Sequence, residues 1–509
     1  MGNQIHKKIT KDRGACLIIG LCVCVLVFLC SPYSPIYQYC FKEDEICYKI
    51  MAKGLLNGKM PYRDLFDHKG PLTYFIYALG YIFSQNTDVG VMLVLAVINV
   101  ATYITAYKAL RLFYGEGKSL LTVSSFLVIT GFSAANILST MSKPENILLL
   151  PIMLSVYILL RKYRDAQISK EYLFSMKEIY IIGLLCGCVF AIKLNFCIYY
   201  LTFIGFYFLW LLIKKHFKKF ILHAVLFLSG ILTVSAPILI FYGMNNALKS
   251  LFDTYILFNI SYSTKEKPFG LSYLGGMAQI SGMLFLILMI IGIVIDIKTK
   301  TIKPQMCVFT AASIIVICFV LSPIMTFAYT LIVLMPILLF GINRIVDLVI
   351  NLVKDDKTVM QLSMIIAVVM CINMGYQMLY ILPSSGSDNS EYEQRLKYFT
   401  ELHPQAEFMF FECLCQPLCY DLTDGLPSFR VFYLPPMATD AIVAEQLIAI
   451  KDGKPDAVVF PYNNLYGDPY DSFAEYVKAN GYSLYAVYVS DSESGKLLFV
   501  RQDDAVFVT

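Results

Sequence analysis

Residues 220–243 read FILHAVLFLSGILTVSAPILIFYG, a run that contains no Asp, Glu, Lys or Arg. A helix needs roughly 17 to 25 apolar residues to cross the ~30 Å hydrocarbon core of a bilayer, so this run is long enough to span it. The whole chain of 509 residues has the same character, since 58% of its residues are hydrophobic and only 15% are charged. These values are far from those of soluble proteins. The sequence therefore predicts an all-α polytopic membrane protein.

Eleven apolar runs of this kind occur before residue 383. They cover approximately residues 15–33, 89–110, 119–138, 146–160, 178–192, 196–213, 220–243, 274–297, 306–322, 327–343 and 358–381. If the N-terminus is cytoplasmic, 22 of the 33 Lys and Arg residues of residues 1–382 fall in cytoplasmic loops, as the positive-inside rule requires. An odd number of spans then places the C-terminal tail outside. The first run is too long for a signal peptide and lacks a small-residue cleavage site, so we expect it to be retained as a span.

One apolar stretch is too short to cross the bilayer. Residues 71–84 read PLTYFIYALGYIFS, and counting them as a span would reverse the charge pattern of every later loop. We therefore expect this stretch to lie in the outer interface, where aromatic side chains are favoured. Residues 34–88 then form one large extracytoplasmic loop, and residues 243–270 form a second one.

The tail differs from the rest of the chain in charge and in hydrophobic pattern. Residues 383–509 carry 19 acidic and 8 basic residues, whereas residues 1–382 carry 18 acidic and 33 basic ones. Short apolar or alternating segments predict strands at 406–411, 456–461, 482–489 and 496–501. Helices are expected at 391–402, 439–450 and 471–480. The sequence thus predicts a membrane domain over residues 1–382 and a small extracytoplasmic α/β or α+β domain over residues 383–509.

The densest set of ionisable residues outside the spans lies in the first outer loop. It comprises Glu43-Asp44-Glu45, Gly58-Lys59-Met60-Pro61-Tyr62-Arg63-Asp64 and Asp67-His68-Lys69-Gly70-Pro71-Leu72. Ionisable groups at the membrane are costly and often functional, so this set suits a place where a charged lipid headgroup meets a reacting group. The alternative interpretation, that these are solvated loop charges, is equally consistent with composition alone.

The order and placement of these motifs resemble the GT-C superfamily of membrane glycosyltransferases. The resemblance rests on the pair Asp44-Glu45 with Tyr48, on the Gly-x-x-Pro-Tyr-Arg-Asp segment, and on Lys69-Gly70-Pro71-Leu72 opening an interfacial helix. The chain is similar to the branch of dolichyl-phosphate-mannose protein mannosyltransferases and aminoarabinose transferases, glycosyltransferase family 39 and its relatives. The similarity is strong over residues 34–90, fair to about residue 245, and architectural afterwards. It implies a GT-C-like fold of about eleven transmembrane helices that transfers a sugar from a polyprenyl-phosphate carrier to an acceptor at the outer face.

By this resemblance Asp44 is the catalytic residue. A carboxylate within hydrogen-bond reach of an acceptor hydroxyl takes its proton as the glycosidic bond breaks. One carboxylate suffices for a single inverting displacement, because phosphate is a good leaving group. Glu45 is the neighbour expected to share or orient the site. The alternative for both residues is that they merely cap an interfacial helix.

The expected cations follow from the phosphate of the donor. Lys69 is expected to hold it, with Arg63 and His68 as lesser candidates, since a phosphate needs compensating cations where water is scarce; snorkelling to headgroups is the alternative. Lys193, at the outer end of a glycine-containing span, is a further candidate because an unpaired ammonium in lipid is costly. In the next outer loop Glu145 is the second acidic candidate. The family often has Asp-Pro where this chain has Lys-Pro-Glu, so Glu145 is either a site acid or a helix N-terminal acid.

No cofactor is required by these residues, although Asp44, Glu45 and Glu145 are compatible with a divalent metal because hard cations prefer carboxylates. The lack of a P-loop and of a Rossmann glycine fingerprint argues against a nucleotide sugar as donor and against an ATP-driven pump. The net charge of +4 is too small and too unevenly placed for nucleic-acid binding. Most of the 15 cysteines lie in spans. Outward-facing cysteines that could form disulfides in an oxidising compartment are Cys40, Cys47, Cys413, Cys415 and Cys419.

The sequence thus predicts a multi-pass glycosyltransferase of a bacterial plasma membrane, with its N-terminus in the cytoplasm and its C-terminal domain outside. Its partners would be the lipid bilayer, a polyprenyl-phosphate sugar donor and a glycan, lipid or protein acceptor. The alternative is a transporter or flippase of lipid-linked glycans, which predicts charges near the bilayer middle and interrupted spans in both halves. The charges cluster instead at the outer face, which favours the transferase. An inactive scaffold that binds partners through the tail is a third alternative.

Overall fold

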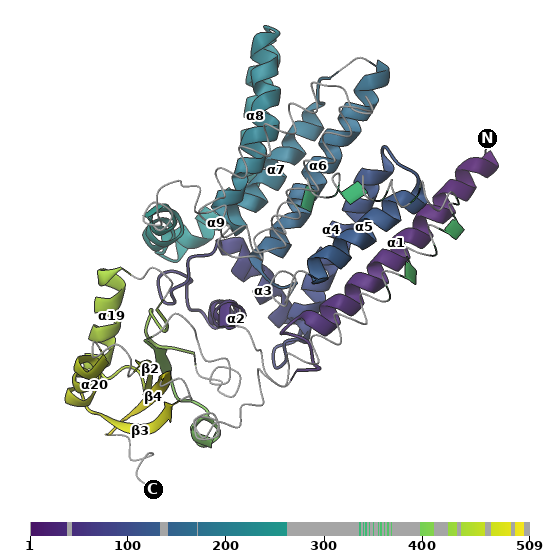
Figure 1. Ribbon diagram of the computed structural model, residues 1–509. Helices are drawn as coiled ribbons and strands as arrows, with labels where there is room; N and C mark the ends of the chain where they lie inside the picture. Colours follow the sequence, from purple (N-terminus) through teal and green to yellow (C-terminus); the bar gives the residue numbers. More distant parts are fainter. Residues whose placement is uncertain are drawn as a thin grey trace.

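The computed structural model describes residues 2–37, 43–132, 141–169, 172–261, 398–411, 426–434, 439–463, 470–489 and 494–502, with scattered positions between 335 and 368. Each of the seven apolar runs expected before residue 245 forms a helix there (Figure 1). These helices are α1 (Gly2–Cys30), α4 (Val89–Arg111), α5 (Glu116–Phe132), α6 (Pro144–Ser169), α7 (Met176–Ile192), α8 (Ile198–Ile213) and α9 (Phe217–Met244).

Five segments of the described chain are long and apolar enough to cross a membrane. They are Asp12–Cys30, Val89–Arg111, Pro144–Gln167, Leu194–Ile213 and Phe217–Met244. Helices α5 and α7 are shorter, with 17 residues each. The later expected runs, at 274–297, 306–322, 327–343 and 358–381, lie largely outside the described residues, and so does the expected domain boundary at residue 383. The total of eleven spans stays a prediction.

Two short helices occupy the first outer loop. α2 (Glu43–Leu56) packs against α3 (Pro71–Phe83), which packs in turn against α4. α3 has 13 residues, hence a length of ~20 Å, and does not reach across a ~30 Å hydrocarbon core. Pro71 stands in its first turn, where a missing N–H costs nothing. The apolar stretch at residues 71–84 is thus a helix too short to span, as its length predicts.

The close packing of α7 on α9 depends on small residues. A Cβ atom at Gly183 would lie 2.1 Å from the carbonyl oxygen of Phe227, and one at Gly230 would lie 2.3 Å from that of Tyr180. Glycines permit such backbone contact between membrane helices, where van der Waals packing replaces the hydrophobic effect as the driving force. This contact fixes the direction of α7, whose C-terminal end carries Lys193.

Short turns follow α7 and α9. A 3-10 turn, η1 (Leu194–Cys197), follows α7. After α9 come one helical turn, α10 (Leu248–Leu251), and a π-helix, η2 (Phe252–Phe258). These last two lie in the second expected outer loop, of which residues 262–270 fall outside the described part.

The C-terminal domain, described within residues 398–502, contains a four-stranded mixed sheet. Its strands are β1 (Phe408–Phe410), β2 (Ala457–Asn463), β3 (Tyr482–Val489) and β4 (Ser494–Arg501), and its helices include α19 (Asp440–Lys451) and α20 (Tyr470–Ala479). The strand order is β1-β2-β4-β3, in which β1 runs parallel to β2 and the other pairs are antiparallel. All four predicted strands are confirmed, as are the predicted helices at 439–450 and 471–480. Of the helix predicted at 391–402, residues 398–402 are described and are helical.

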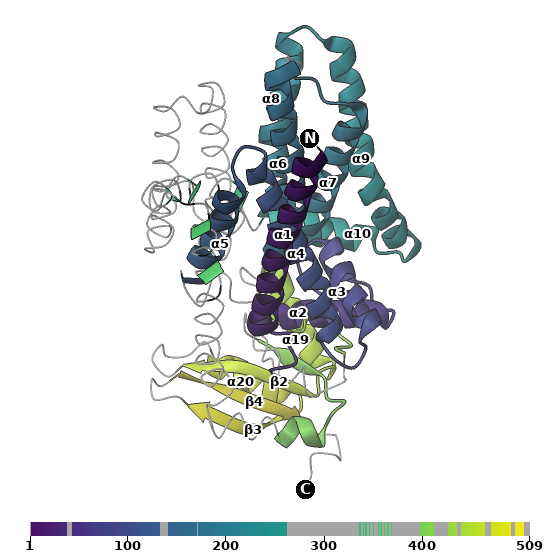
Figure 2. The same ribbon diagram turned by 90° about the vertical axis from the view of Figure 1, so that its right-hand side faces the viewer.

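The sheet and the N-terminus of α1 lie at opposite ends of the membrane helices. Figures 1 and 2 both show the sheet beyond α2 and α3, with the N-terminus at the far end of α1. The expected topology, with the N-terminus on one side of the membrane and the tail on the other, is compatible with this arrangement and stays a prediction. The arrangement brings the C-terminal domain next to the first outer loop.

Candidate active site

Two outer loops meet at the start of α2. Lys143 Nζ lies 2.7 Å from Asp44 Oδ2, and Ser142 Oγ donates a hydrogen bond of 2.8 Å to Glu45 Oε1. The side chain of Asp44 is 45% exposed, whereas Glu45 is fully buried. Consecutive acids of α2 therefore bind consecutive residues of the loop between α5 and α6. Asp44 is the acid of this pair that a ligand can reach.

The backbone that carries Ser142 and Lys143 is held by α3 and α4. Tyr77 donates a hydrogen bond to the carbonyl of Ser142, and Asn99 Nδ2 donates one of 3.0 Å to the carbonyl of Met141. Met141 has a φ of 45°, in the left-handed region that non-glycine residues seldom adopt. Strained backbone of this kind persists where surrounding contacts hold it, and it gathers at functional sites. These contacts place Lys143 opposite Asp44.

Glu145 and Lys193 form a second ion pair. Glu145 stands in the first turn of α6 and Lys193 at the C-terminal end of α7, and Lys193 Nζ lies 2.5 Å from Glu145 Oε1. Their side chains are only 2% and 17% exposed, respectively. Burial of two charges is costly, so each ion depends on the other to offset its loss of hydration. The position of Glu145 also suits the positive end of the α6 dipole, so both interpretations of this residue are compatible with the structure.

Three consecutive residues before α3 form a second row of polar contacts. Asp67 is 1% exposed, and its carboxylate accepts hydrogen bonds from the His68 amide at 2.7 Å and from the Tyr74 hydroxyl at 3.0 Å. Lys69 Nζ lies 2.9 Å from His68 Nε2. Because an ammonium group only donates, Nε2 must be the acceptor, which assigns the ring proton to Nδ1, 3.3 Å from Asp67 Oδ1.

A glycine lets this row approach the end of α7. Gly70 N donates a hydrogen bond of 2.9 Å to the carbonyl of Ile192, and a Cβ at Gly70 would lie 2.2 Å from the carbonyl oxygen of Ala191. Only a residue without a side chain fits so close to backbone atoms. The carbonyl of Lys69 is fixed as well, by a 2.6 Å hydrogen bond from the Tyr62 hydroxyl. The backbone of Lys69 is therefore docked beside the backbone that leads to Lys193.

The charges of the two loops influence one another. Burial raises the pKa of Asp44, but the charges of Lys143 and Lys69 outweigh it and hold that pKa well below its usual range. Burial lowers the pKa of Lys143, but Glu45 and Asp44 outweigh it and raise that pKa. Burial and the charge of Lys69 lower the pKa of His68. At neutral pH the site thus presents an ionised carboxylate at Asp44, an ammonium at Lys143 and a neutral imidazole at His68.

Six of the seven candidates named from the sequence come together in this cluster. They are Asp44, Glu45, His68, Lys69, Glu145 and Lys193. Arg63 does not join them, because its guanidinium pairs with Asp64 through two contacts of 2.7 Å and donates to the carbonyl of Asn245 at 2.6 Å. Its side chain is 39% exposed, and it ties the first outer loop to the end of α9.

Three residues of the site have no role predicted from the sequence: Lys143, Asp67 and Tyr433, whose hydroxyl lies 3.2 Å from Asp67 Oδ1. Lys143 carried a usable signal, because cations are depleted from outer loops and a lone lysine in a short outer loop is unusual. Asp67 carries a weaker signal, its place in the ionisable set of the first outer loop directly before His68 and Lys69. Tyr433 had no local signal, since nothing in its surrounding sequence indicates contact with a loop 366 residues away.

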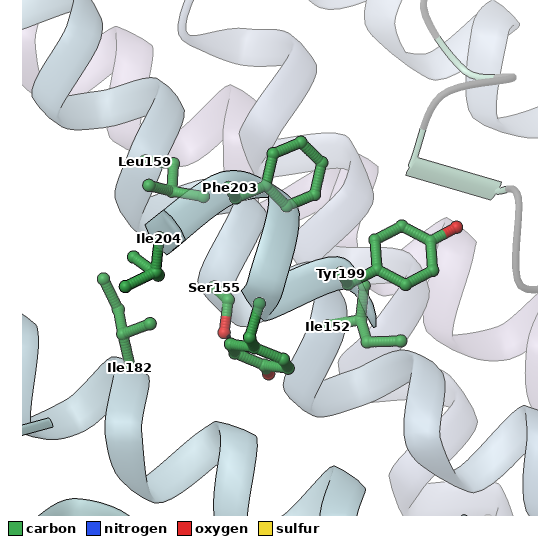
Figure 3. Close-up of a pocket in the computed structure, with 8 residues that line it drawn as sticks. Ile152, Ser155, Leu159, Ile182, Tyr199, Phe203 and Ile204 are labelled. Atoms are coloured by element: carbon green, nitrogen blue, oxygen red, sulfur yellow. Dashed lines mark hydrogen bonds between the residues drawn. The ribbon is translucent and has the colours of Figure 1, made fainter. Parts of the chain in front are cut away.

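A small apolar pocket lies apart from this cluster, between α6, α7 and α8 (Figure 3). Its lining is Ile152, Ser155, Leu159, Ile182, Tyr199, Tyr200, Phe203 and Ile204. Its polar groups bind each other, since the hydroxyls of Ser155 and Tyr200 are 3.0 Å apart. The pocket offers no charged group for chemistry on a sugar phosphate.

The described residues contain no group of three or more His, Cys, Asp or Glu side chains arranged to hold a metal ion. The carboxylates of Asp44 and Glu145 are instead engaged by Lys143 and Lys193. Of the cysteines expected to face outward, Cys47 is buried in α2, and Cys40, Cys413, Cys415 and Cys419 lie outside the described residues.

Comparison with known proteins agrees with this architecture. Residues 68–241 match the family model described as dolichyl-phosphate-mannose-protein mannosyltransferase. The crystal structure of ArnT from Cupriavidus metallidurans bound to undecaprenyl phosphate is similar with a TM-score of 0.62 at 12% sequence identity, over 96% of this chain and 98% of that one. The apo structure of the same ArnT is similar with a TM-score of 0.57 at 11% identity, over 95% of this chain and 97% of that one. No curated protein sequence matches the chain.

The structural similarity extends over nearly the whole chain, so the fold is shared from the first helix to the C-terminal domain. The family match covers the segment from His68 into the last turn of α9, which includes the loop between α5 and α6 and both residues of the Glu145–Lys193 pair. The apolar helices and this fold describe a multi-pass membrane protein. These findings confirm the resemblance that the sequence showed: the chain has the fold of the GT-C superfamily of membrane glycosyltransferases, and its residues 68–241 match one of their family models.

Proposed function

We propose that this protein transfers a sugar from a polyprenyl-phosphate-linked donor to an acceptor hydroxyl at the outer face of the plasma membrane. The observation that carries the proposal is Asp44, a partly exposed carboxylate kept ionised by Lys143 in a cluster that also contains Lys69 and Lys193. Such a transfer needs a base for the proton of the acceptor hydroxyl and cations for the charge of the leaving phosphate, close to one another. The names of the similar proteins support the same class of donor, because one family acts with dolichyl-phosphate-mannose and one structure holds undecaprenyl phosphate.

In the proposed reaction Asp44 acts as the general base. Its carboxylate takes the proton of the acceptor hydroxyl while the hydroxyl oxygen forms a bond to the anomeric carbon of the donor sugar. The bond from that carbon to the phosphate oxygen breaks, and the phosphate leaves with the electron pair. One displacement at the anomeric carbon inverts its configuration. Its low pKa makes Asp44 a weak base. It contributes by its position, because it accepts the proton when the hydroxyl becomes acidic in the transition state.

The lysines stabilise the negative charge that grows on the leaving phosphate. The backbone of Lys69 is docked next to α7, and its carbonyl accepts a hydrogen bond from Tyr62. Its ammonium group lies beside His68 and is one of the cations of the cluster. Lys143 is already bound to Asp44, so a donor phosphate near this pair would share Lys143 with the carboxylate. Charge-assisted hydrogen bonds of this kind are short and strong. The reaction written in this way requires no cofactor.

The proposal also covers the topology of the protein, its location and its acceptor. We place the N-terminus in the cytoplasm and the C-terminal domain outside a bacterial plasma membrane, because cationic loops gather on one side and the sheet lies at the opposite end of α1. The acceptor is a glycan, a lipid or a protein with a free hydroxyl group. A transporter of lipid-linked glycans remains the alternative function, and the experiment below distinguishes the two.

The test is turnover by purified protein in liposomes, with a panel of radiolabelled undecaprenyl-phosphate sugars and a bacterial envelope extract that supplies acceptor hydroxyl groups. We expect the wild type to release undecaprenyl phosphate from one of them and Asp44→Asn, at equal abundance, to release none above background. Asp165→Asn is the matched control, because Asp165 is a 51% exposed carboxylate paired with Arg164 at 2.8 Å near the C-terminal end of α6. If Asp44→Asn turns over donor as fast as the control, Asp44 is not the base. If no donor is consumed while a lipid-linked glycan crosses the bilayer, the protein is a transporter.

A further inference from the structure

A short segment of the C-terminal domain, residues 430–434, lies against the first outer loop. The amide of Phe66 donates a hydrogen bond of 2.8 Å to the carbonyl of Arg430. The Arg430 side chain donates to the carbonyl of Tyr62 at 2.7 Å, and its guanidinium lies 4.9 Å from the centre of the Phe66 ring. The same group reaches Thr254 Oγ1 of η2 at 3.2 Å. The C-terminal domain is thus anchored to the loop that carries Lys69 and to the turn after α9.

An apolar contact closes around this anchor. Phe66 and Val431 are each 2% exposed and form one cluster with Ile442 of α19, against which Phe258 and Leu434 also pack. Because the cluster combines residues of the first outer loop, of η2 and of the C-terminal domain, its burial opposes separation of these parts. The position of residues 430–434 relative to the first loop is therefore well defined.

From this position Tyr433 reaches the residue that precedes His68. The Tyr433 hydroxyl donates a hydrogen bond of 3.2 Å to Asp67 Oδ1, the oxygen that also accepts from the His68 amide and faces His68 Nδ1. Tyr433 is 5% exposed and Asp67 is 1% exposed, so water cannot easily replace this bond. Asp67 thus receives donors from three elements: α3 through Tyr74, the first outer loop through His68, and the C-terminal domain through Tyr433.

The row of contacts continues to the cation of the proposed donor site. With Asp67 on its Nδ1 side, His68 presents Nε2 as an acceptor, and Lys69 Nζ lies 2.9 Å from it. The backbone oxygen of His68 is fixed separately, by a 2.7 Å hydrogen bond from Asn259 Nδ2. The negative charge of Asp67 Oδ1, 3.3 Å from Nδ1, favours the ring proton on that nitrogen and leaves Nε2 as an acceptor. The position of the Asp67 carboxylate therefore helps to decide whether His68 can hold the Lys69 ammonium.

We propose that the C-terminal domain positions the phosphate-binding lysine of the site, with Tyr433 as the positioning residue that acts on Lys69 through Asp67 and His68. This inference rests on the proposed function for the role of Lys69, and goes beyond it by giving the C-terminal domain a part in donor binding. Tyr433 touches neither donor nor acceptor in this scheme. Its hydroxyl restricts the Asp67 carboxylate to the orientation that the imidazole needs.

The test compares two Tyr→Phe variants of the C-terminal domain. Tyr433→Phe removes the hydroxyl that binds Asp67, while Tyr482→Phe removes an equally buried hydroxyl that donates to the Pro455 carbonyl at 2.7 Å, inside the same domain. Undecaprenyl phosphate binding is measured for the full-length protein in nanodiscs. We expect the Kd to rise about two- to ten-fold in Tyr433→Phe, the size typical of one lost hydrogen bond, and to stay at the wild-type value in Tyr482→Phe. Donor KM should rise with it, while kcat changes less.

A second readout does not depend on activity or on donor binding. The protein is labelled with ¹⁵N at its five histidines, and the His68 ring signal is identified by its loss in His68→Gln. In Tyr433→Phe the Asp67 carboxylate loses one hydrogen-bond donor, so its negative charge stabilises protonated His68 more strongly. The titration midpoint of His68 should therefore move upward. In Tyr482→Phe it should not move.

The outcomes separate the two proposals. An unchanged Kd together with an unchanged His68 titration in Tyr433→Phe overturns the positioning role. Equal losses of binding in Tyr433→Phe and Tyr482→Phe also overturn it, since they would show general damage to the domain. If the wild type neither binds undecaprenyl phosphate nor turns over any donor, the proposed function fails. The His68 titration then still decides whether Tyr433 controls this row of residues.

Discussion

Lys143 and Asp44, 99 positions apart in the chain, form an ion pair of 2.7 Å between the two outer loops. The pair joins the residue expected to be catalytic to one that no motif singled out. The lysine side chain is 14% exposed and the aspartate side chain is 45% exposed. The carboxylate is therefore the more accessible of the two groups, and the lysine lies on its buried side. This arrangement explains why Asp44 stays ionised in spite of partial burial.

Removal of that lysine should damage turnover. In Lys143→Met the leaving phosphate loses one ammonium, and the Asp44 carboxylate loses the 2.7 Å contact that holds it in place. We expect kcat/KM for the donor to fall by roughly 100-fold, the scale of ~3 kcal/mol of lost transition-state stabilisation. Lys162→Met, a change of the same kind at the other end of α6, should match the wild type. Wild-type kinetics in Lys143→Met would remove Lys143 from the mechanism.

The Glu145–Lys193 pair predicts strong coupling in stability. Either Glu145→Gln or Lys193→Met alone leaves one poorly hydrated charge, at a cost of about 3 kcal/mol or more. The double variant leaves no such charge and should be less destabilised than the sum of the single variants by more than ~1 kcal/mol. Thermal unfolding in detergent measures all four forms. Additive losses would mean that the two side chains do not depend on each other.

Gly70 tests the docking of the first loop on α7. A Cβ in Gly70→Ala would meet the Ala191 carbonyl oxygen at 2.2 Å, and backbone atoms cannot rotate away as a side chain can. The loop must therefore shift and carry Lys69 with it, and misplacement by ~1 Å costs about 100-fold in rate. Gly205→Ala in α8, where no atom lies within 4 Å of the added carbon, is the control. Equal turnover by both variants would contradict the docking argument.

His68 predicts an acid limit for donor binding. Burial and the charge of Lys69 lower its pKa below the ordinary 6.5, so the folded protein holds a neutral ring at neutral pH. Asp67 opposes this shift, and Lys193 adds to it. Protonation turns Nε2 from an acceptor into a donor facing an ammonium, so the contact that holds Lys69 is lost as pH falls through the lowered pKa, and undecaprenyl phosphate binding should change with pH in this range in the wild type but less in His68→Gln. Asp44, with its own pKa held still lower than usual, does not titrate in that range.

The same residue affects stability in the same direction. Below pH 6.5 the unfolded chain takes up a proton on His68 that the folded protein resists, so the stability of the fold decreases as pH falls from 6.5 through the folded pKa. His68→Gln removes this dependence. Thermal unfolding measured from pH 5 to 8 checks it, and an unchanged pH dependence in His68→Gln would refute the assignment.

Arg430 predicts how firmly the C-terminal domain is attached. Arg430→Met keeps the aliphatic stem but loses the hydrogen bonds to Tyr62 and Thr254 and the 2.7 Å ion pair with Glu445. Opening of the interface exposes the Phe66 amide, so its hydrogen exchange should accelerate about ten-fold or more, as for a local opening made easier by ~1.4 kcal/mol. The matched control is Arg501→Met, which breaks contacts to Gly453 and Asp456 within the C-terminal domain only. Equal acceleration in both variants would point to unfolding of the domain.

Local sequence patterns predicted the elements well because each element is determined by its own residues. The run at residues 220–243 is long and apolar enough to form a membrane helix whatever its neighbours are. The segments at 406–411 and 482–489 show the short apolar runs or the apolar–polar alternation that are typical of strands. The length of the apolar stretch at 71–84 predicted that it does not span the membrane, and the helix there is indeed only 13 residues long. Charge in the loops supplied a further constraint, since it distinguishes the two sides of the membrane.

The candidate site was predicted only in part. Asp44, Lys69 and Lys193 are visible in sequence because ionisable residues beside apolar spans are rare and costly. Their partners are not visible, because an ion pair requires proximity in space and leaves no mark on the spacing along the chain. Arg63 illustrates the same limit. The sequence shows its positive charge, but it does not show that Arg63 forms an ion pair with Asp64 and lies outside the site.

The sequence by itself therefore determined the membrane class of this protein, the positions of most of its described helices and of its strands, and the loop that carries most of the proposed site. The tertiary structure alone decided that Lys143 neutralises Asp44, that Gly70 brings Lys69 to the end of α7, and that Tyr433 reaches Asp67. The physical reason is range. Hydrophobicity and helix or strand period act over a few residues, whereas these contacts join segments separated by about 100 residues or more along the chain, and they form only when the whole fold has brought the segments together.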